Sequence, residues 1–188
     1  MVYALTGFMG SGKSSVGREL AALLSSDFID LDDYIVGKAG MSIPEIFASS
    51  GEEGFRSLES SCLAEILSPE HNPAPANPQG TISQNAGVST AASDLVLSLG
   101  GGTILRAENA ALIAAHCRCV FLRTSLETVR QRLEGESAGR PMLQRSDVGE
   151  LFAARAAAYA TAADVIIDTD SLSPSEIARK IIGRYQVL

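Results

Sequence analysis

The sequence predicts an α/β fold with a mostly parallel β-sheet, and two observations support this. Short continuous apolar runs, as expected of strands covered on both faces, alternate along the chain with longer segments of helical periodicity. A glycine-rich loop, TGFMGSGKSS at 6–15, joins the first such run to the first helical segment. Regular alternation of strands and helices is typical of the α/β class, in which helices cover a parallel sheet.

The predicted elements follow from these periodicities. Short apolar runs give four predicted strands, at 2–5, 95–99, 119–122 and 164–168, and the segment DFID at 27–30 is a further short strand candidate. The segments with helical spacing lie at 14–24, 31–40, 43–50, 52–67, 108–116, 125–134, 154–159 and 174–185. Three helices open with a capping-box pattern, a hydroxyl followed three residues later by a glutamate: Ser42 with Glu45, Thr124 with Glu127, and Ser173 with Glu176.

Composition bounds the organisation and the partners of the chain. At 188 residues and 46% hydrophobic content it can bury one good core, so we expect a single domain, 1–188. A monomer is expected because no apolar stripe is left unassigned. The net charge of −7 argues against nucleic acid and anionic membrane as partners. The three cysteines lack zinc-like spacing, and no secretory signal or membrane-spanning run is present, so we expect a cytoplasmic protein with reduced thiols.

One stretch, 68–94, breaks the alternation of strand and helix. It holds four of the seven prolines, has no Lys or Arg, and shows no sustained apolar period. This composition predicts a long loop or a flexible insertion. We expect a tolerated surface insertion, with a partner-docking segment as the alternative.

The glycine-rich loop predicts a nucleotide site. Its residues fit G-x-x-x-x-G-K-[ST], with the required strand before the loop and helix after it. In such a loop, backbone N–H groups and the positive end of the helix hold a polyphosphate, the lysine reaches the β- and γ-phosphates, and the serine hydroxyl ligates Mg²⁺. The predicted nucleotide-binding residues are Gly10, Ser11, Gly12, Lys13, Ser14 and Ser15.

Acids and glycines follow two other predicted strands, where ligands bind in open α/β sheets. Asp30 and Asp32 alternate, so in an extended segment they would share a side, one serving a metal shell and the other a substrate hydroxyl. Gly100, Gly101 and Gly102 directly follow a buried strand and suggest a backbone that a ligand approaches closely. The alternatives are acids that merely favour a helix N-terminus, and a flexible turn.

Three arginines are candidate anion ligands in this acidic chain. Arg56 lies in GFRSLE, Arg155 in the alanine-rich ARAAAY, and Arg140 in EGESAGRPML. Glycines and a proline around Arg140 predict a mobile lid at about 135–146, which would close over ATP and bring a cation to the transferring phosphoryl group. For each arginine taken alone, a solvated surface charge is the alternative.

Taken in order, these motifs resemble the shikimate kinase family. The resemblance rests on GFMGSGKSSVGRELA, FIDLDDYI, SIPEIFASSGEEGFRSLES, LSLGGGTI, GRPML and RAAAY, and covers nearly the whole chain apart from 68–94. It implies a P-loop NTPase-type, three-layer α/β/α fold with a five-stranded parallel sheet and a mobile lid. It also implies transfer of the γ-phosphoryl group of ATP to the 3-hydroxyl of shikimate, a step of aromatic amino-acid biosynthesis.

The resemblance further implies a role for each acceptor-side residue. Asp32 would hold the reacting hydroxyl and act as base or orienting group. Arg56 and Arg155 would grip the shikimate carboxylate, and the glycine backbone, at Gly101 above all, would contact the ring. Arg suits this task because its guanidinium offers a bidentate fork to a carboxylate.

On the nucleotide side the resemblance implies one Mg²⁺ ion bound with ATP. Asp30 would sit in the shell of this ion through water, beside Ser14. Arg140 would be the lid arginine, and Arg132, with Arg130 as the alternative, would lie against adenine. Phosphoryl transfer depends on positioning and charge neutralisation more than on base strength, so Lys13, Mg²⁺ and Arg140 carry most of the burden.

Two other functions stay open. Another small-molecule P-loop kinase, for gluconate or a nucleoside, would also need the loop and a lid arginine, but not the combined DLDD, GFR, GGG and RAAAY set. A nucleotide-binding switch would lack acceptor chemistry, and the guanine-reading motif N/T-K-x-D is absent from the sequence. The residues favour a shikimate kinase over both.

Overall fold

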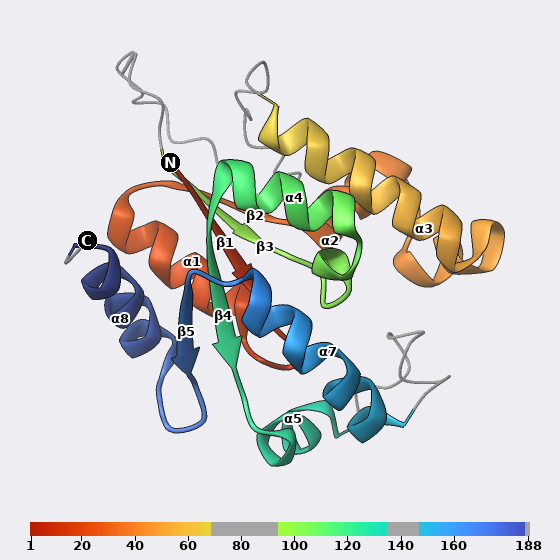
Figure 1. The fold of residues 1–188 in the computed structure, drawn as a ribbon. Helices are drawn as coiled ribbons and strands as arrows, with labels where there is room; N and C mark the ends of the chain where they lie inside the picture. The colour runs from red at the N-terminus through yellow and green to blue at the C-terminus, as the bar shows by residue number, and fades with distance from the viewer. Residues whose placement is uncertain (69–93, 135–146, 187–188) are drawn as a thin grey trace.

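The computed structural model describes residues 1–68, 94–134 and 147–186 (Figure 1). The predicted lid at 135–146, with Arg140, lies outside the described residues, as does the predicted insertion apart from its two end residues. No structural outcome is therefore attached to these two predictions.

Five strands form one sheet: β1 Val2–Thr6, β2 Asp27–Asp30, β3 Leu95–Ser98, β4 Cys117–Arg123 and β5 Val165–Asp168. Their order is β2-β3-β1-β4-β5, and every neighbouring pair is parallel. The predicted five-stranded parallel sheet is confirmed. β4 begins before the predicted apolar run because Cys117 and Arg118 already pair with the start of β1.

Helices cover both faces of this sheet. They are α1 Lys13–Leu24, α2 Leu31–Ala39, α3 Ile43–Leu67, the 3₁₀-helix η1 Thr103–Leu105, α4 Ala107–His116, α5 Leu126–Leu133, α7 Val148–Ala162 and α8 Pro174–Gln186. In the described part of the chain, none of these helices combines the length and apolar character needed to cross a membrane.

Alternate residues of the central strand face the two helical layers. Tyr3 and Leu5 of β1 belong to one core cluster, together with residues of α1 and α8. Ala4, between them, belongs to a second cluster that includes residues of α2, α3, α4, α5 and α7. Because successive side chains of a strand point to opposite faces, the sheet is the middle of three layers, as the α/β/α prediction requires (Figure 1).

The capping-box predictions have a mixed outcome. At Ser42 the capping box forms, and Ser173 exchanges the same hydrogen bonds with Glu176. The prediction that Thr124 caps α5 was wrong by one residue, because Ser125 is the cap and accepts from the Thr128 N–H. The Thr124 hydroxyl is instead buried in a 2.7 Å hydrogen bond with the hydroxyl of Thr169.

Helix α3 changes direction at Gly51, where the backbone has φ 69° and ψ −175°. This glycine falls between the two helical segments that the sequence predicts at 43–50 and 52–67. The two parts stay packed together, since the rings of Phe47 and Phe55 lie 4.8 Å apart between centroids. The break lets one helix line the site with residues from both of its halves.

The topology determines where a ligand site forms. β1 is central, and the chain leaves it for the sheet edge at β2 before it returns to β3 beside β1 and then crosses to β4. In open parallel sheets of this kind a crevice opens beyond the carboxyl ends of the strands, where successive connections diverge to the two faces. The glycine-rich loop, the aspartates and the triple glycine follow β1, β2 and β3 and meet at this edge.

Candidate active site

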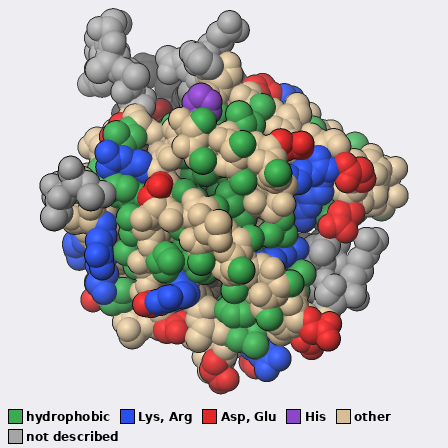
Figure 2. Space-filling model, viewed as in Figure 1, with side chains coloured by type: hydrophobic (Ala, Val, Ile, Leu, Met, Phe, Trp, Pro, Cys, Tyr) green, Lys and Arg blue, Asp and Glu red, His purple; other side chains and the backbone are tan. Residues whose placement is uncertain are grey.

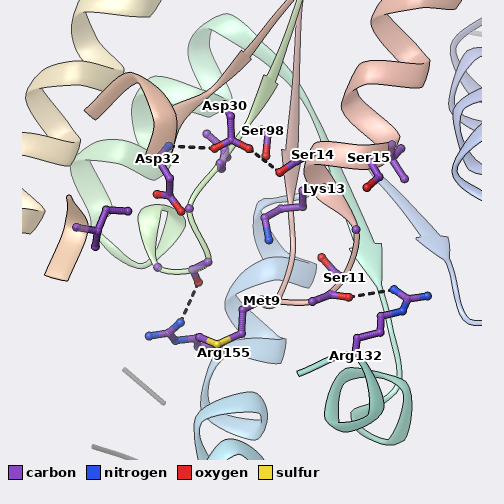
Figure 3. A pocket seen from close by; sticks show the side chains of 18 of the residues that line it. Met9, Ser11, Lys13, Ser14, Ser15, Asp30, Asp32, Ser98, Arg132 and Arg155 are labelled. Carbon is purple, nitrogen blue, oxygen red and sulfur yellow. Dashed lines mark hydrogen bonds between the residues drawn. The ribbon is translucent and has the colours of Figure 1, made fainter. Parts of the chain in front are cut away.

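A cleft of about 620 Å³ opens at the carboxyl ends of β1, β2 and β3. Its lining brings together every sequence-predicted site residue that the structure describes: Gly10, Ser11, Gly12, Lys13, Ser14, Ser15, Asp30, Asp32, Arg56, Gly100, Gly101, Gly102, Arg132 and Arg155. Arg140 is the one member of the predicted set outside the described residues. Figure 3 shows Lys13 and Ser14 on the side of the loop that faces Asp30 and Asp32, with Ser14 in contact with Asp30.

The loop after β1 has the backbone of a phosphate cradle. Gly7, Gly10 and Gly12 have φ values of 146°, 77° and 90°, in the left-handed region that side chains disfavour. A Cβ at Gly7 would also lie 2.8 Å from the Leu122 carbonyl oxygen, so this position needs glycine on two counts. Lys13 opens α1, and its Nζ donates to the Gly7 and Phe8 carbonyls at 2.9 and 3.0 Å. The ammonium group therefore lies over the loop that it follows.

Asp30 joins the loop to the end of β2. Its Oδ2 accepts a 2.5 Å hydrogen bond from the Ser14 hydroxyl, and its Oδ1 accepts from the Asp32 N–H at 3.1 Å (Figure 3). Asp30 is the N-cap of α2, so the predicted extended conformation of this segment was wrong, although both aspartates do line the same cleft. The helix begins at Leu31, and the fold uses the acids for capping and for the cleft at once.

The Asp32 carboxyl is the group in this cleft whose acidity is most clearly altered among the described residues. Its pKa is raised from 3.8 to about 6, first by burial and then by the negative charges of Asp30 and Glu59. Lys13 and Arg56 act in the opposite sense. Near neutral pH the group is thus a carboxylate with a higher proton affinity than an exposed aspartate, which suits a residue that accepts a hydroxyl proton.

Two of the three glycines after β3 lie so close to charged side chains that a Cβ would not fit, and the third binds Arg155 through its carbonyl. A Cβ at Gly100 would lie 2.8 Å from Glu59 Oε1 and 3.0 Å from Asp32 Oδ1, and a Cβ at Gly102 would overlap the Arg56 guanidinium. The Gly101 carbonyl accepts from Arg155 Nη1 at 3.2 Å. The flexible-turn alternative is therefore not needed, because the triple glycine is a close approach between backbone and charged side chains.

Arg56 is held by an acid that sequence reasoning missed. Its Nη1 donates to Glu59 Oε2 at 2.7 Å, and the Glu59 residue has 0% exposure. The guanidinium also lies 5.2 Å from the centroid of the Phe55 ring. The spacing of three residues in FRSLE puts arginine and glutamate on one helix face, which was the available signal. The burial of Glu59, however, could be seen only in the folded structure.

Arg155 reaches the cleft from the opposite side, on α7. It is 5% exposed, so the alternative of a solvated surface charge does not apply to it. Tyr159, one turn later, donates its hydroxyl to the same Gly101 carbonyl at 2.5 Å and was also missed from the sequence. Burial raises the pKa of Tyr159 to about 12, which keeps the phenol protonated as a donor.

The positive charges of the site are local. In the view of Figure 2, Lys, Arg, Asp and Glu side chains are interspersed around the edge of a more hydrophobic central area. Arg56 and Arg155 are instead withdrawn, with side-chain exposure of 13% for Arg56 and residue exposure of 5% for Arg155. A buried cation is costly unless an anion accompanies it. Glu59 already accompanies Arg56, whereas Arg155 donates to the neutral Gly101 carbonyl, so Arg155 in particular favours an anionic ligand in the cleft.

Arg132, near the end of α5, lies at the outer end of the glycine loop. Its Nη1 donates to the Gly10 carbonyl at 3.0 Å (Figure 3), and it lines the cleft. Arg130, the alternative from the sequence, is not among the described residues that line the cleft. The geometry therefore brings Arg132, and not Arg130, to the nucleotide side.

The donor set beside the loop suits Mg²⁺. The Ser14 hydroxyl and the Asp30 carboxylate are hydrogen-bonded to each other, and both are hard oxygen ligands. Across the described ranges no cluster of three or more His, Cys, Asp and Glu side chains is available for a metal. Few protein ligands are expected for Mg²⁺ at a nucleotide site, where phosphates and waters complete the shell.

Comparison with known proteins agrees with this geometry. A family model described as shikimate kinase matches residues 9–73 and 85–186, so only 74–84 separates the two matched stretches, within the predicted insertion. A shikimate kinase from Stenotrophomonas maltophilia is 37% identical over 182 residues, covering 95% of this chain and 88% of the relative. A shikimate kinase from Dictyoglomus turgidum is 32% identical over 187 residues, covering 97% and 96%.

A solved structure gives the same result. Shikimate kinase from Acinetobacter baumannii, in complex with shikimate, superposes with a TM-score of 0.82 at 32% sequence identity. The superposition covers 99% of this chain and 93% of the other.

Proposed function

The chain belongs to the shikimate kinase family and is thus a phosphotransferase, and we propose that the cleft described above transfers the γ-phosphoryl group of ATP to the 3-hydroxyl of shikimate. The products are shikimate 3-phosphate and ADP, in a step towards aromatic amino acids. The observation that carries the proposal is the position of Asp32, Arg56 and Arg155 in one cleft with the phosphate-binding loop.

On the nucleotide side, the loop from Gly10 to Ser15 binds the phosphates of ATP. Lys13 neutralises charge on the β- and γ-phosphates, as its place over the loop supports. Ser14 and Asp30 would hold one Mg²⁺ ion, which would supply positive charge to the phosphate oxygens. Arg132 lies against adenine.

On the acceptor side, the cleft recognises a small anionic polyol. Arg56 and Arg155 bind the carboxylate of shikimate, since guanidinium groups present paired donors to two carboxylate oxygens. The backbone of Gly100, Gly101 and Gly102 lies along the ring. Asp32 orients the reacting hydroxyl towards the loop and accepts its proton.

The chemistry requires alignment more than a strong base. The transferring group passes through a loose transition state with negative charge on its oxygens, so cations and in-line geometry supply most of the rate enhancement. Lys13 supplies one such cation. Arg140, which lies outside the described residues, is proposed from the sequence to supply another.

Replacing Arg155 with alanine tests the acceptor side. We expect the shikimate KM to rise about 10- to 100-fold, the loss for removing charged hydrogen bonds, while the ATP KM stays unchanged. Arg184→Ala, at an exposed site on α8, is the matched control and leaves both KM values unchanged. Steady-state kinetics with each substrate varied in turn gives the result, and an unchanged shikimate KM in Arg155→Ala contradicts the assignment.

Replacing Gly102 with alanine tests the close approach of the backbone to Arg56. Gly102 has φ −113° and ψ −8°, which alanine adopts freely, so only the added methyl group matters. Because a Cβ there would overlap the guanidinium, Arg56 must move, and we expect a higher shikimate KM at normal ATP KM. Gly37→Ala, where a Cβ meets nothing within 4 Å, is the control and changes neither. Equal kinetics for the two variants would refute the role of Gly102.

An ADP-release assay with a panel of acceptors tests the function itself. With Mg²⁺ and ATP, we expect rapid ADP release with shikimate and only a slow background with gluconate, nucleosides or no acceptor. Faster release with gluconate or a nucleoside would show that the protein is another kind of small-molecule kinase. Release that no acceptor stimulates would leave an ATPase or a nucleotide-binding switch.

We further propose that the chain acts as one domain, as a monomer, and in the cytoplasm. Support for the monomer and for the location comes from composition alone. Size-exclusion chromatography coupled to light scattering measures the mass in solution, for which 19.7 kDa is the monomer value.

A further inference from the structure

The Glu59 carboxylate, missed in the sequence, is bound at both of its oxygens. Oε2 accepts from Arg56 Nη1 at 2.7 Å, and Oε1 accepts from the Thr103 hydroxyl at 2.7 Å. Glu59 and Thr103 both have 0% exposure. Solvent therefore cannot replace either hydrogen bond, and the orientation of the carboxylate depends on these two donors.

Thr103 is itself held in place by two hydrogen bonds of its backbone. It is the first residue of η1, directly after the triple glycine, and its N–H donates to the Gly100 carbonyl at 3.2 Å. Its own carbonyl accepts from Asn109 Nδ2 of α4 at 3.0 Å, and Asn109 is fully buried. The hydroxyl thus links a rigid part of the glycine segment to α3.

Arg56 has a second carboxylate within reach on its own helix. Glu52, one turn earlier, lies 3.9 Å from Arg56 Nε and is 45% exposed at its side chain. A guanidinium that loses its buried partner is drawn towards such an exposed acid, where both charges stay hydrated. The hydrogen bond from Arg56 Nη1 to Glu59 therefore favours the orientation of the guanidinium into the cleft.

We infer that Thr103 is a positioning residue for the acceptor: its hydroxyl fixes the Glu59 carboxylate, which in turn holds Arg56 in the orientation that binds the acceptor's anionic group. The inference rests on the proposed function of the cleft and adds to it a residue that lies behind the binding surface. Thr103 acts only through Glu59 and Arg56, so its removal affects binding of the acceptor and not of the nucleotide.

Thr103→Val tests this inference, since valine keeps the branched shape and removes the donor. We expect the shikimate KM to rise by up to about tenfold, the limit if the whole of one hydrogen bond to a charged group is used to position Arg56, with the ATP KM and kcat unchanged. Thr103→Ser restores the donor and returns the shikimate KM to the wild-type value. Calorimetric titration of each protein with shikimate gives the same order of affinities without turnover.

Two further variants separate positioning from a general loss of stability. Thr124→Val removes another buried threonine hydroxyl, bonded to Thr169 and outside the cleft lining, and leaves the shikimate KM unchanged. Thr103→Ala loses the donor without placing a new apolar group against the carboxylate, and shows the acceptor effect even where valine impairs folding.

The outcomes distinguish this inference from the function on which it rests. Wild-type protein without shikimate-dependent ADP release would overturn the proposed function. Active wild-type protein with an unchanged shikimate KM in Thr103→Val and Thr103→Ala overturns only the positioning role. An equal rise in both KM values, no rescue by serine, or the same effect in Thr124→Val also overturns it, because those results indicate a structural defect.

Discussion

Replacing Asp32 with asparagine will lower kcat by about two orders of magnitude or more, the range expected when a proton-accepting group is lost. The amide keeps the size of the side chain and can still contact the hydroxyl, but it cannot take the proton. Its oxygen also lacks the negative charge that aligns the hydroxyl towards the phosphoryl group. The nucleotide contacts are untouched, so the ATP KM stays near the wild-type value.

The same substitution will stabilise the fold at neutral pH. The folded-state pKa of Asp32 is about 6, above its unfolded value of 3.8, so the folded state binds the proton more tightly. The protonated Asp32 carboxyl therefore makes its full contribution to the free energy of unfolding below about pH 4. This contribution is lost as pH rises from about 4 to 6, and above that range the ionised carboxylate destabilises the fold. A difference of one pH unit in pKa corresponds to about 1.4 kcal/mol, so the gain in Asp32→Asn is at most about 3 kcal/mol at pH 7.

Thermal melts of both proteins without nucleotide or Mg²⁺ measure this gain. The Tm of Asp32→Asn exceeds that of wild type at pH 7, and the difference shrinks as pH falls through 6 towards 4. In wild type, kcat/KM for shikimate falls on the acid side of about pH 6, because protonated Asp32 is inactive. Wild-type kcat in the variant, or a Tm below wild type at pH 7, would contradict the role given to Asp32.

Replacing Lys13 with methionine will lower kcat by about three orders of magnitude, comparable to the loss of a donor that stabilises transition-state charge. The ammonium group lies against the loop backbone, through its bonds to the Gly7 and Phe8 carbonyls. Methionine is similar in length and apolar, so the fold is kept while the charge is lost. Lys13 also lowers the Asp32 pKa, so the acid limb of the variant's pH profile moves to higher pH.

Lys180→Met is the matched control for this prediction. Lys180 lies on α8 and is not part of the cleft lining among the described residues. We expect normal kcat and normal pH dependence from it. If Lys13→Met retained most of the wild-type activity, the role of the loop in phosphoryl transfer would be contradicted, whatever the acceptor.

Much of the fold could be predicted because its signals are local. Short apolar runs mark four of the five strands, the segment DFID marks β2, and Gly51 separates two helical segments at the point where α3 changes direction. The loop motif carries its own backbone requirement, since three of its glycines adopt left-handed φ values. Errors at this level were small and also local, as at Thr124, where two adjacent hydroxyl residues compete for one cap.

The candidate site was predictable only where a motif names its residues. Asp30, Asp32 and the triple glycine stand next to strand ends, so the parallel topology brings them together. Glu59 and Thr103 are 44 residues apart, and no spacing rule links them. The same limit explains why Tyr159 was missed, since the Gly101 carbonyl that it binds is 58 residues away. Contacts of this kind depend on the three-dimensional packing of helices over the sheet.

The most direct test of the account is to identify the product. Wild-type protein is mixed with ATP, Mg²⁺ and shikimate, and the reaction is followed by phosphorus NMR with mass spectrometry of the products. We expect every ADP formed to be matched by one phosphate ester at the 3-hydroxyl of shikimate, with no free phosphate. ADP accompanied by inorganic phosphate and unmodified shikimate would contradict it.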